Sequence, residues 1–168
     1  LTITRDKIAA ACEDFRHLCR YYFTQPTYLR IDDRPLAMIY VTRALRGDVS
    51  GLIGSLREAC AQEEFDVFLV GDEFYFRRSP SRYSIEKWDG IFGYDVYGGK
   101  GGYWGENSTL DLFRRRSAEY AAKARESGVL FLPSIAPGFN DRAVRRICAD
   151  NPAMPRRLTA GANPTSLF

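Results

Sequence analysis

Strand-length apolar segments recur along this sequence, and they alternate with segments of helical periodicity. Buried strands are expected at residues 36–41, 66–71 and 88–95, and a fourth begins at Val129. Uninterrupted apolar runs are typical of strands that are covered on both faces. Between them, apolar residues return at the three- and four-residue spacing of amphipathic helices. Alternating strands and helices predict a parallel sheet with right-handed crossovers.

A helix and a turn precede this alternation. Apolar residues at helical spacing predict an amphipathic helix over residues 8–22, and Pro26 ends it. Residues 28–31 then predict a short strand, and Asp32-Asp33 predicts a turn before the apolar run, since Asp residues favour turns.

The length constrains the architecture further. A complete eight-unit barrel needs about 250 residues, whereas this chain has 168. We therefore expect one domain, residues 1–168, that forms the central portion of a partial (β/α)8 TIM-like barrel with parallel strands. An open doubly wound sheet is the alternative. The first residue is Leu1, so we expect an excised piece, with residues 150–168 as a poorly ordered tail.

Composition argues against several classes of function. With 45% hydrophobic residues, 27% charged residues and a net charge of +3, the chain is expected to fold. It carries no nucleic-acid-binding motif and no apolar stretch of membrane-spanning length. The four cysteines lack metal-ligand spacing, and His17 is the single histidine. We therefore expect no metal site, no cofactor, no nucleic-acid partner and no membrane span.

Polar and aromatic side chains follow the predicted strands, where loops carry ligand chemistry in strand–helix folds. Carboxylates and an amide there could bind sugar hydroxyls, and aromatic rings could stack on a sugar's apolar face. For the carboxylates the alternative is a structural role, such as helix capping or pairing with an arginine; for the rings it is packing. The candidate substrate-binding residues are Asp72, Glu73, Tyr94, Asp95, Tyr97, Trp104, Phe139, Asn140 and Asp141.

Three segments carry a resemblance to a known family. They are Tyr-Leu-Arg-Ile-Asp-Asp-Arg-Pro-Leu-Ala-Met-Ile-Tyr at 28–40, Trp-Asp-Gly-Ile-Phe-Gly-Tyr-Asp-Val-Tyr at 88–97, and Phe-Leu-Pro-Ser-Ile-Ala-Pro-Gly-Phe-Asn-Asp-Arg at 131–142. Together they resemble the glycoside hydrolase family 99-like group, which includes endo-α-mannosidases and bacterial polysaccharide-locus proteins labelled as glycosyltransferases. The resemblance implies a (β/α)8 barrel that cleaves or transfers at α-mannosidic or related linkages without a metal.

The sequence departs from the family at two points. Phe139 stands where the mannosidases tend to have tyrosine, so a hydroxyl is missing. The Glu-x-x-Glu pattern that carries the family's catalytic carboxylates on a later strand does not follow the strand at Phe131. No catalytic residue is therefore assigned within this chain.

Three functions remain open. The first is the central part of a retaining glycoside hydrolase, or a related carbohydrate-active enzyme, that binds an oligo- or polysaccharide and takes its acid/base pair from further sequence. The second is a non-catalytic carbohydrate-binding or degenerate barrel protein. The third is a glycosyltransferase of polysaccharide biosynthesis, for which the chain offers neither a DxD metal motif nor a phosphate-binding loop.

Overall fold

A curled, mostly parallel sheet of five strands forms the centre of the fold. The computed structural model describes residues 1–75, 78–80, 85–94 and 107–133. The strands are β1 (Arg30–Ile31), β2 (Arg34–Ile39), β3 (Phe68–Asp72), β4 (Gly90–Phe92) and β5 (Leu130–Leu132). They lie in the sheet in the order in which they occur in the chain. An open doubly wound sheet reverses its strand order at a switch point, so this order is that of a half-barrel.

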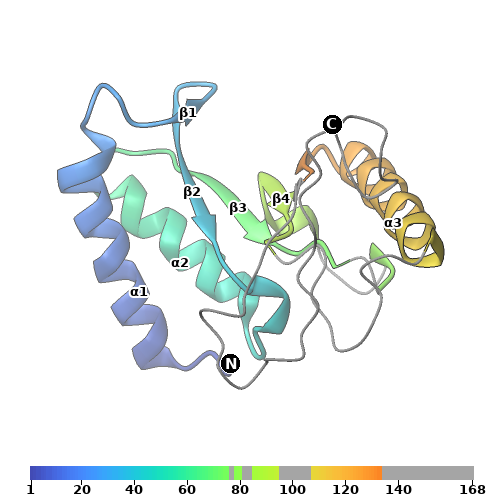
Figure 1. Cartoon of the computed structure of the whole chain (residues 1–168). Helices are drawn as coiled ribbons and strands as arrows, with labels where there is room; N and C mark the ends of the chain where they lie inside the picture. Colours follow the sequence, from blue (N-terminus) through green and yellow to red (C-terminus); the bar gives the residue numbers. More distant parts are fainter. Residues whose placement is uncertain (76–77, 81–84, 95–106, 134–168) are drawn as a thin grey trace, which may run out of the picture.

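The parallel part of the sheet is built from consecutive units. Strand β2 pairs in parallel with β3, β3 with β4, and β4 with β5. The main helices are α1 (Arg5–Leu18), α2 (Val49–Ala61) and α3 (Asn107–Glu126). Helix α2 connects β2 to β3, and α3 connects β4 to β5 (Figure 1). The short helical turn Ile85–Lys87 precedes β4. The predicted partial barrel is confirmed.

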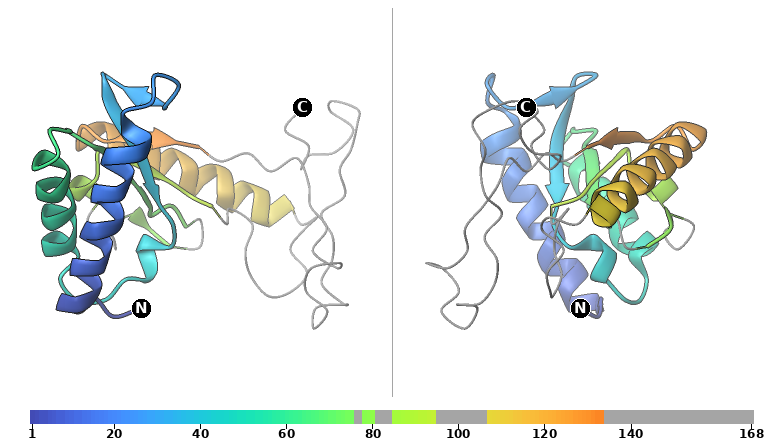
Figure 2. Two further views of the ribbon diagram at one scale, coloured as in Figure 1. Left: turned by 90° about the vertical axis from the view of Figure 1, so that its left-hand side faces the viewer. Right: turned by 45° about the vertical axis from the view of Figure 1, so that its right-hand side comes forward.

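Helices α1 and α3 lie at opposite edges of the sheet (Figures 1 and 2). Helix α1 packs along α2 and continues as a π-helical turn over Cys19–Phe23. Helix α3 contacts β5 and ends near Gly128, whose positive φ of 67° suits a residue that closes a helix. No helix in the described part of the chain is long and apolar enough to cross a membrane.

The predicted turn at Asp32-Asp33 joins β1 to β2 as a two-residue antiparallel hairpin. Both aspartates have positive φ, 49° and 61°, as a tight hairpin turn of this length requires. The prediction that the following strand is covered on both faces is wrong for β2. Pro35 and Ala37 are buried, but Met38 on the other face is half-exposed, because helices of the described chain cover β2 on one side. Strand β3 is buried throughout.

The core lies between the sheet and the helices. Helix α2 buries the apolar face predicted for it, including Leu56 and Cys60, and Tyr120 of α3 is fully buried. The side chain of Asp48 caps α2 by accepting a hydrogen bond from the Gly51 N–H at 2.8 Å. Cys12, Cys19 and Cys60 are buried free thiols.

Candidate functional site at the carboxyl ends of the strands

The carboxyl ends of β2, β3 and β4 bring the candidate residues together. Tyr40 follows β2, Asp72 ends β3 with Glu73 next to it, and Tyr94 lies two residues beyond β4. Because the three strands are parallel neighbours, their carboxyl ends meet at one edge of the sheet. In barrel folds this edge carries the ligand-binding groups.

Asp72 ties these three strand ends to one another. Its side chain is fully buried. The Val41 N–H donates to Oδ2 at 2.9 Å, and the Tyr94 N–H donates to Oδ1 at 3.1 Å. The guanidinium group of Arg43 forms an ion pair with the same carboxylate. Both carboxylate oxygens are therefore engaged by the protein, and Asp72 acts as a brace between β2, β3 and β4.

Val41 has a strained backbone conformation next to Asp72. Its φ is 59°, in the left-handed region that β-branched residues rarely adopt. A residue held in such a region costs roughly 1–3 kcal/mol, and it persists only where the surroundings enforce it. The hydrogen bond to Asp72 supplies that constraint. The bend at Val41 turns the chain sharply after Tyr40 and into the helical turn Thr42–Ala44, which carries Arg43.

Glu73 differs from Asp72 in its surroundings. Its side chain is 6% exposed. Burial raises the pKa of this carboxyl group, and the negative charge of Asp72 adds to the increase. The neighbouring side chains of Thr42 and Trp88, together with Arg43, oppose the shift without cancelling it. A buried carboxyl group with a raised pKa at a strand end is a candidate functional group, since such perturbations concentrate at functional sites.

Trp88 reaches this carboxyl group because β3 carries a glycine beneath it. A Cβ atom built on Gly71 would lie 2.5 Å from Cε2 of Trp88, so only glycine leaves room for the indole. Trp88 itself is 3% exposed. The close contact with Gly71 thus allows the indole of Trp88 to lie beside Glu73.

Tyrosine rings lie beside the same strand ends. The rings of Tyr40 and Tyr94 meet edge to face with centroids 4.5 Å apart. The guanidinium of Arg43 lies 5.7 Å from the ring centre of Tyr75, and that of Arg78 lies 6.0 Å from the same ring. The site therefore combines carboxyl groups, arginine side chains and tyrosine rings, a mixture suited to a polar ligand with an apolar face.

The structure brings three of the predicted substrate-binding residues to one edge: Asp72, Glu73 and Tyr94. The other six predicted residues lie outside the described residues, and these are Asp95, Tyr97, Trp104, Phe139, Asn140 and Asp141.

Sequence reasoning missed the parts that Tyr40, Val41 and Trp88 play. Tyr40 lies near the end of the apolar run 36–41, just before a polar loop. This position is the signal from which it could have been predicted as a site residue. The left-handed bend at Val41 has no sequence signal, because valine disfavours it. Trp88 precedes β4 instead of lying within it, since the strand starts only at Gly90.

The amino ends of the same strands carry a second brace. Asp89 accepts hydrogen bonds from the Leu69 N–H at 2.8 Å, from Arg57 at 2.7 Å and from Arg34 at 2.9 Å. Burial alone would raise the pKa of Asp89, but these donors outweigh it and hold the pKa below its usual value. The amino-terminal face of a barrel serves stability, and this network belongs to that role.

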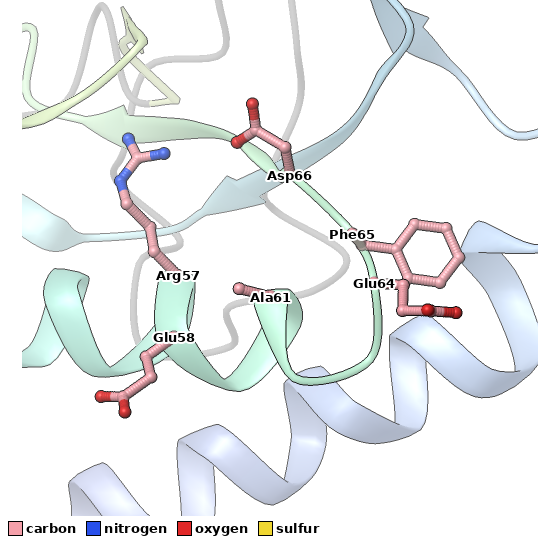
Figure 3. A pocket seen from close by; sticks show the side chains of 6 residues that line it. All are labelled: Arg57, Glu58, Ala61, Glu64, Phe65 and Asp66. Carbon is pink, nitrogen blue, oxygen red and sulfur yellow. The ribbon is translucent and has the colours of Figure 1, made fainter.

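A shallow hollow of about 470 Å³ lies near this amino-terminal end (Figure 3). The end of α2 and the loop before β3 line it with Arg57, Glu58, Ala61, Glu64, Phe65 and Asp66. It is separated from Asp72 and Glu73 by the length of β3. Within the described residues, no group of three His, Cys, Asp or Glu side chains could hold a metal ion.

No protein-family model matches the sequence, and no curated protein matches it significantly. Among solved structures, the chain is similar to the GH99 endo-α-mannosidase from Bacteroides thetaiotaomicron, with a TM-score of 0.59 and 19% sequence identity. This match covers 89% of the chain and 41% of the mannosidase. The structure of the mannosidase in complex with bis-tris-propane matches with the same TM-score of 0.59, 18% identity, and coverage of 87% and 43%.

The chain thus spans less than half the length of the mannosidase structures that it matches. Identity at this level shows a shared fold. Over the aligned region the chain has a GH99-like fold, a partial barrel.

Proposed function

We propose that the chain forms part of the sugar-binding site of a carbohydrate-active enzyme of the retaining glycoside hydrolase type, acting on α-mannosidic or related polysaccharide linkages. Two observations support this. The fold is similar to that of an endo-α-mannosidase, and Glu73 is a buried carboxyl group with a raised pKa at the carboxyl end of the sheet. The two observations carry the proposal together, because the fold alone does not determine function.

The two adjacent carboxyl groups take different roles in this proposal. Glycoside hydrolysis uses two carboxyl groups, about 5 Å apart for retention and about 6.5–9.5 Å for inversion. Asp72 accepts bonds on both oxygens from backbone N–H groups and is paired with Arg43. It therefore has a positioning role. Glu73 is the group that meets a sugar hydroxyl, and the acid/base pair comes from sequence beyond this chain, as the family resemblance implies.

A second candidate is a non-catalytic carbohydrate-binding barrel protein. The engagement of Asp72 by the protein favours it, because among the described residues this leaves Glu73 without a free carboxylate partner. Both candidates predict sugar binding at the same edge of the sheet. They differ in turnover, which only the first predicts once the acid/base pair is present.

The test is binding of α-linked mannobiose and mannotriose to the full chain by calorimetry, with release of reducing ends measured in parallel. We expect binding, no turnover by this chain alone, and binding weakened about fivefold by Glu73→Gln, the effect of losing about one hydrogen bond. Glu58→Gln is the matched control. Glu58 is exposed and lines the hollow of Figure 3, so its substitution should leave binding unchanged.

Three outcomes would count against the proposal. Failure to bind any α-mannoside would contradict it, and so would equal binding by the wild type and Glu73→Gln. Binding of a nucleotide sugar in preference to the free oligosaccharides would favour the glycosyltransferase function instead.

A further inference from the structure

Tyr40 and Tyr94 form a pair of exposed rings at the carboxyl ends of β2 and β4. Their edge-to-face contact, with centroids 4.5 Å apart, spans the end of β3, which lies between these strands. Yet Tyr40 is 57% exposed and Tyr94 is 67% exposed. Most aromatic pairs of this kind gain stability by burial. This pair leaves most of its ring surface to solvent.

The backbone beneath the two rings is fixed. Asp72 accepts a hydrogen bond from the N–H of Tyr94 itself, and another from the N–H of Val41, the residue next to Tyr40. One buried carboxylate therefore sets the distance between the two strand ends that carry the rings. A surface held in its binding geometry loses less entropy when a ligand binds, which is the advantage of preorganisation.

We propose that Tyr40 and Tyr94 form a preorganised platform that binds one uncharged pyranose ring, and that Asp72 is its positioning residue. The apolar C–H face of the sugar would stack on one ring, and the other ring, inclined at 69° to it, would meet the edge of the sugar. The phenol groups would exchange hydrogen bonds with its hydroxyls. This inference rests on the proposed function, which it deepens by naming a subsite and the charge of its ligand.

The charge around the platform favours a neutral sugar. Arg43, which follows the same strand as Tyr40, is neutralised by its ion pair with Asp72. Burial also shifts Glu73 toward its uncharged form. Recognition of a phosphate or a uronic acid calls for a cation that is free to pair with it. Arg43 is the cation that follows the same strand as Tyr40, and it is already committed to Asp72. A neutral hexose therefore fits the Tyr40 side of the platform better than an anionic ligand.

The experiment compares the affinity of α-linked mannotriose for four variants of the full chain. Tyr40→Ala and Tyr94→Ala should each weaken binding at least tenfold, because each removes an aromatic surface that the ligand covers. Tyr94→Phe keeps the ring and should stay within about threefold of the wild type. Tyr21→Ala is the matched control. It removes a tyrosine of similar exposure, 61%, on the π-helical turn after α1, and should change nothing.

The outcomes separate the platform from the proposed function. If the wild type binds mannotriose and Glu73→Gln weakens it, while both alanine variants bind normally, the platform is wrong and the proposed function stands. If both alanine variants lose affinity while Glu73→Gln does not, the platform stands and the role of Glu73 fails. If the wild type itself does not bind mannotriose, both the platform and the proposed function fail. A platform that prefers a nucleotide or an acidic oligosaccharide would overturn the assignment of an uncharged ligand.

Discussion

Replacement of Asp72 by asparagine should destabilise the fold severely. The substitution keeps the shape of the side chain but removes its charge. Arg43, whose side chain is 16% exposed, then loses its partner in a largely buried setting. Removing one partner of a buried ion pair costs about 3–5 kcal/mol.

The hydrogen bonds add to this cost. The asparagine oxygen can accept from Val41 or from Tyr94, and its amide group must then face the other N–H, which is also a donor. A buried N–H left without an acceptor costs about 1–3 kcal/mol. We therefore expect a loss of about 4 kcal/mol or more, a large share of the 5–15 kcal/mol that is typical of a domain.

The assay is urea unfolding followed by circular dichroism, with two controls. Asp66→Asn makes the same chemical change at an exposed aspartate that pairs with Arg34, and should cost less than about 1 kcal/mol. The double variant with Arg43→Met should recover part of the loss, because it removes the unpaired cation. A loss below about 1 kcal/mol for Asp72→Asn, or no recovery in the double variant, would refute the brace.

Three further predictions follow from the same contacts. Because burial raises the pKa of folded Glu73 above its ordinary 4.5, the folded state loses stability as pH rises from about 4.5 through the raised value. Glu73→Gln should therefore be more stable than the wild type at pH 7 in urea unfolding and equal to it below about pH 4. Gly71→Ala should displace Trp88, cost about 1–3 kcal/mol and shift the tryptophan fluorescence; unchanged emission would argue against that contact. Asp89 has a lowered pKa, so its stabilisation exists above pH 3.8 and is lost as pH falls through the lower folded value. Asp89→Asn should cost about 3 kcal/mol at pH 7 and progressively less on acidification, and a constant difference would contradict the network.

Local patterns were enough to predict most of the fold. The helical spacing through Leu56 and Cys60 set the buried face of α2, and the Asp32-Asp33 pair located the hairpin. Consecutive strand–helix units then implied a barrel-like strand order. The exposed side of β2 at Met38 could not be predicted, because an apolar run does not reveal which of its faces a helix covers.

The grouping of candidate residues at one edge of the sheet was predictable for a similar reason. Carboxyl ends of parallel strands share an edge, so Asp72, Glu73 and Tyr94 were expected near one another, and the structure confirms that they share it. The different surroundings of the two carboxylates were not predictable. They depend on N–H groups of residues that follow two other strands, and on the strained bend at Val41, for which the sequence carries no local signal.

The most direct test of the central claim is a nuclear magnetic resonance titration of the full chain with α-linked mannotriose. If the sugar binds at the carboxyl ends of the strands, the backbone amides of Tyr40, Glu73 and Tyr94 should shift together and saturate at one dissociation constant. Amides around Phe65, in the hollow of Figure 3, should stay unchanged. Shifts confined to that hollow, or none at all, would contradict a sugar site at this edge of the sheet.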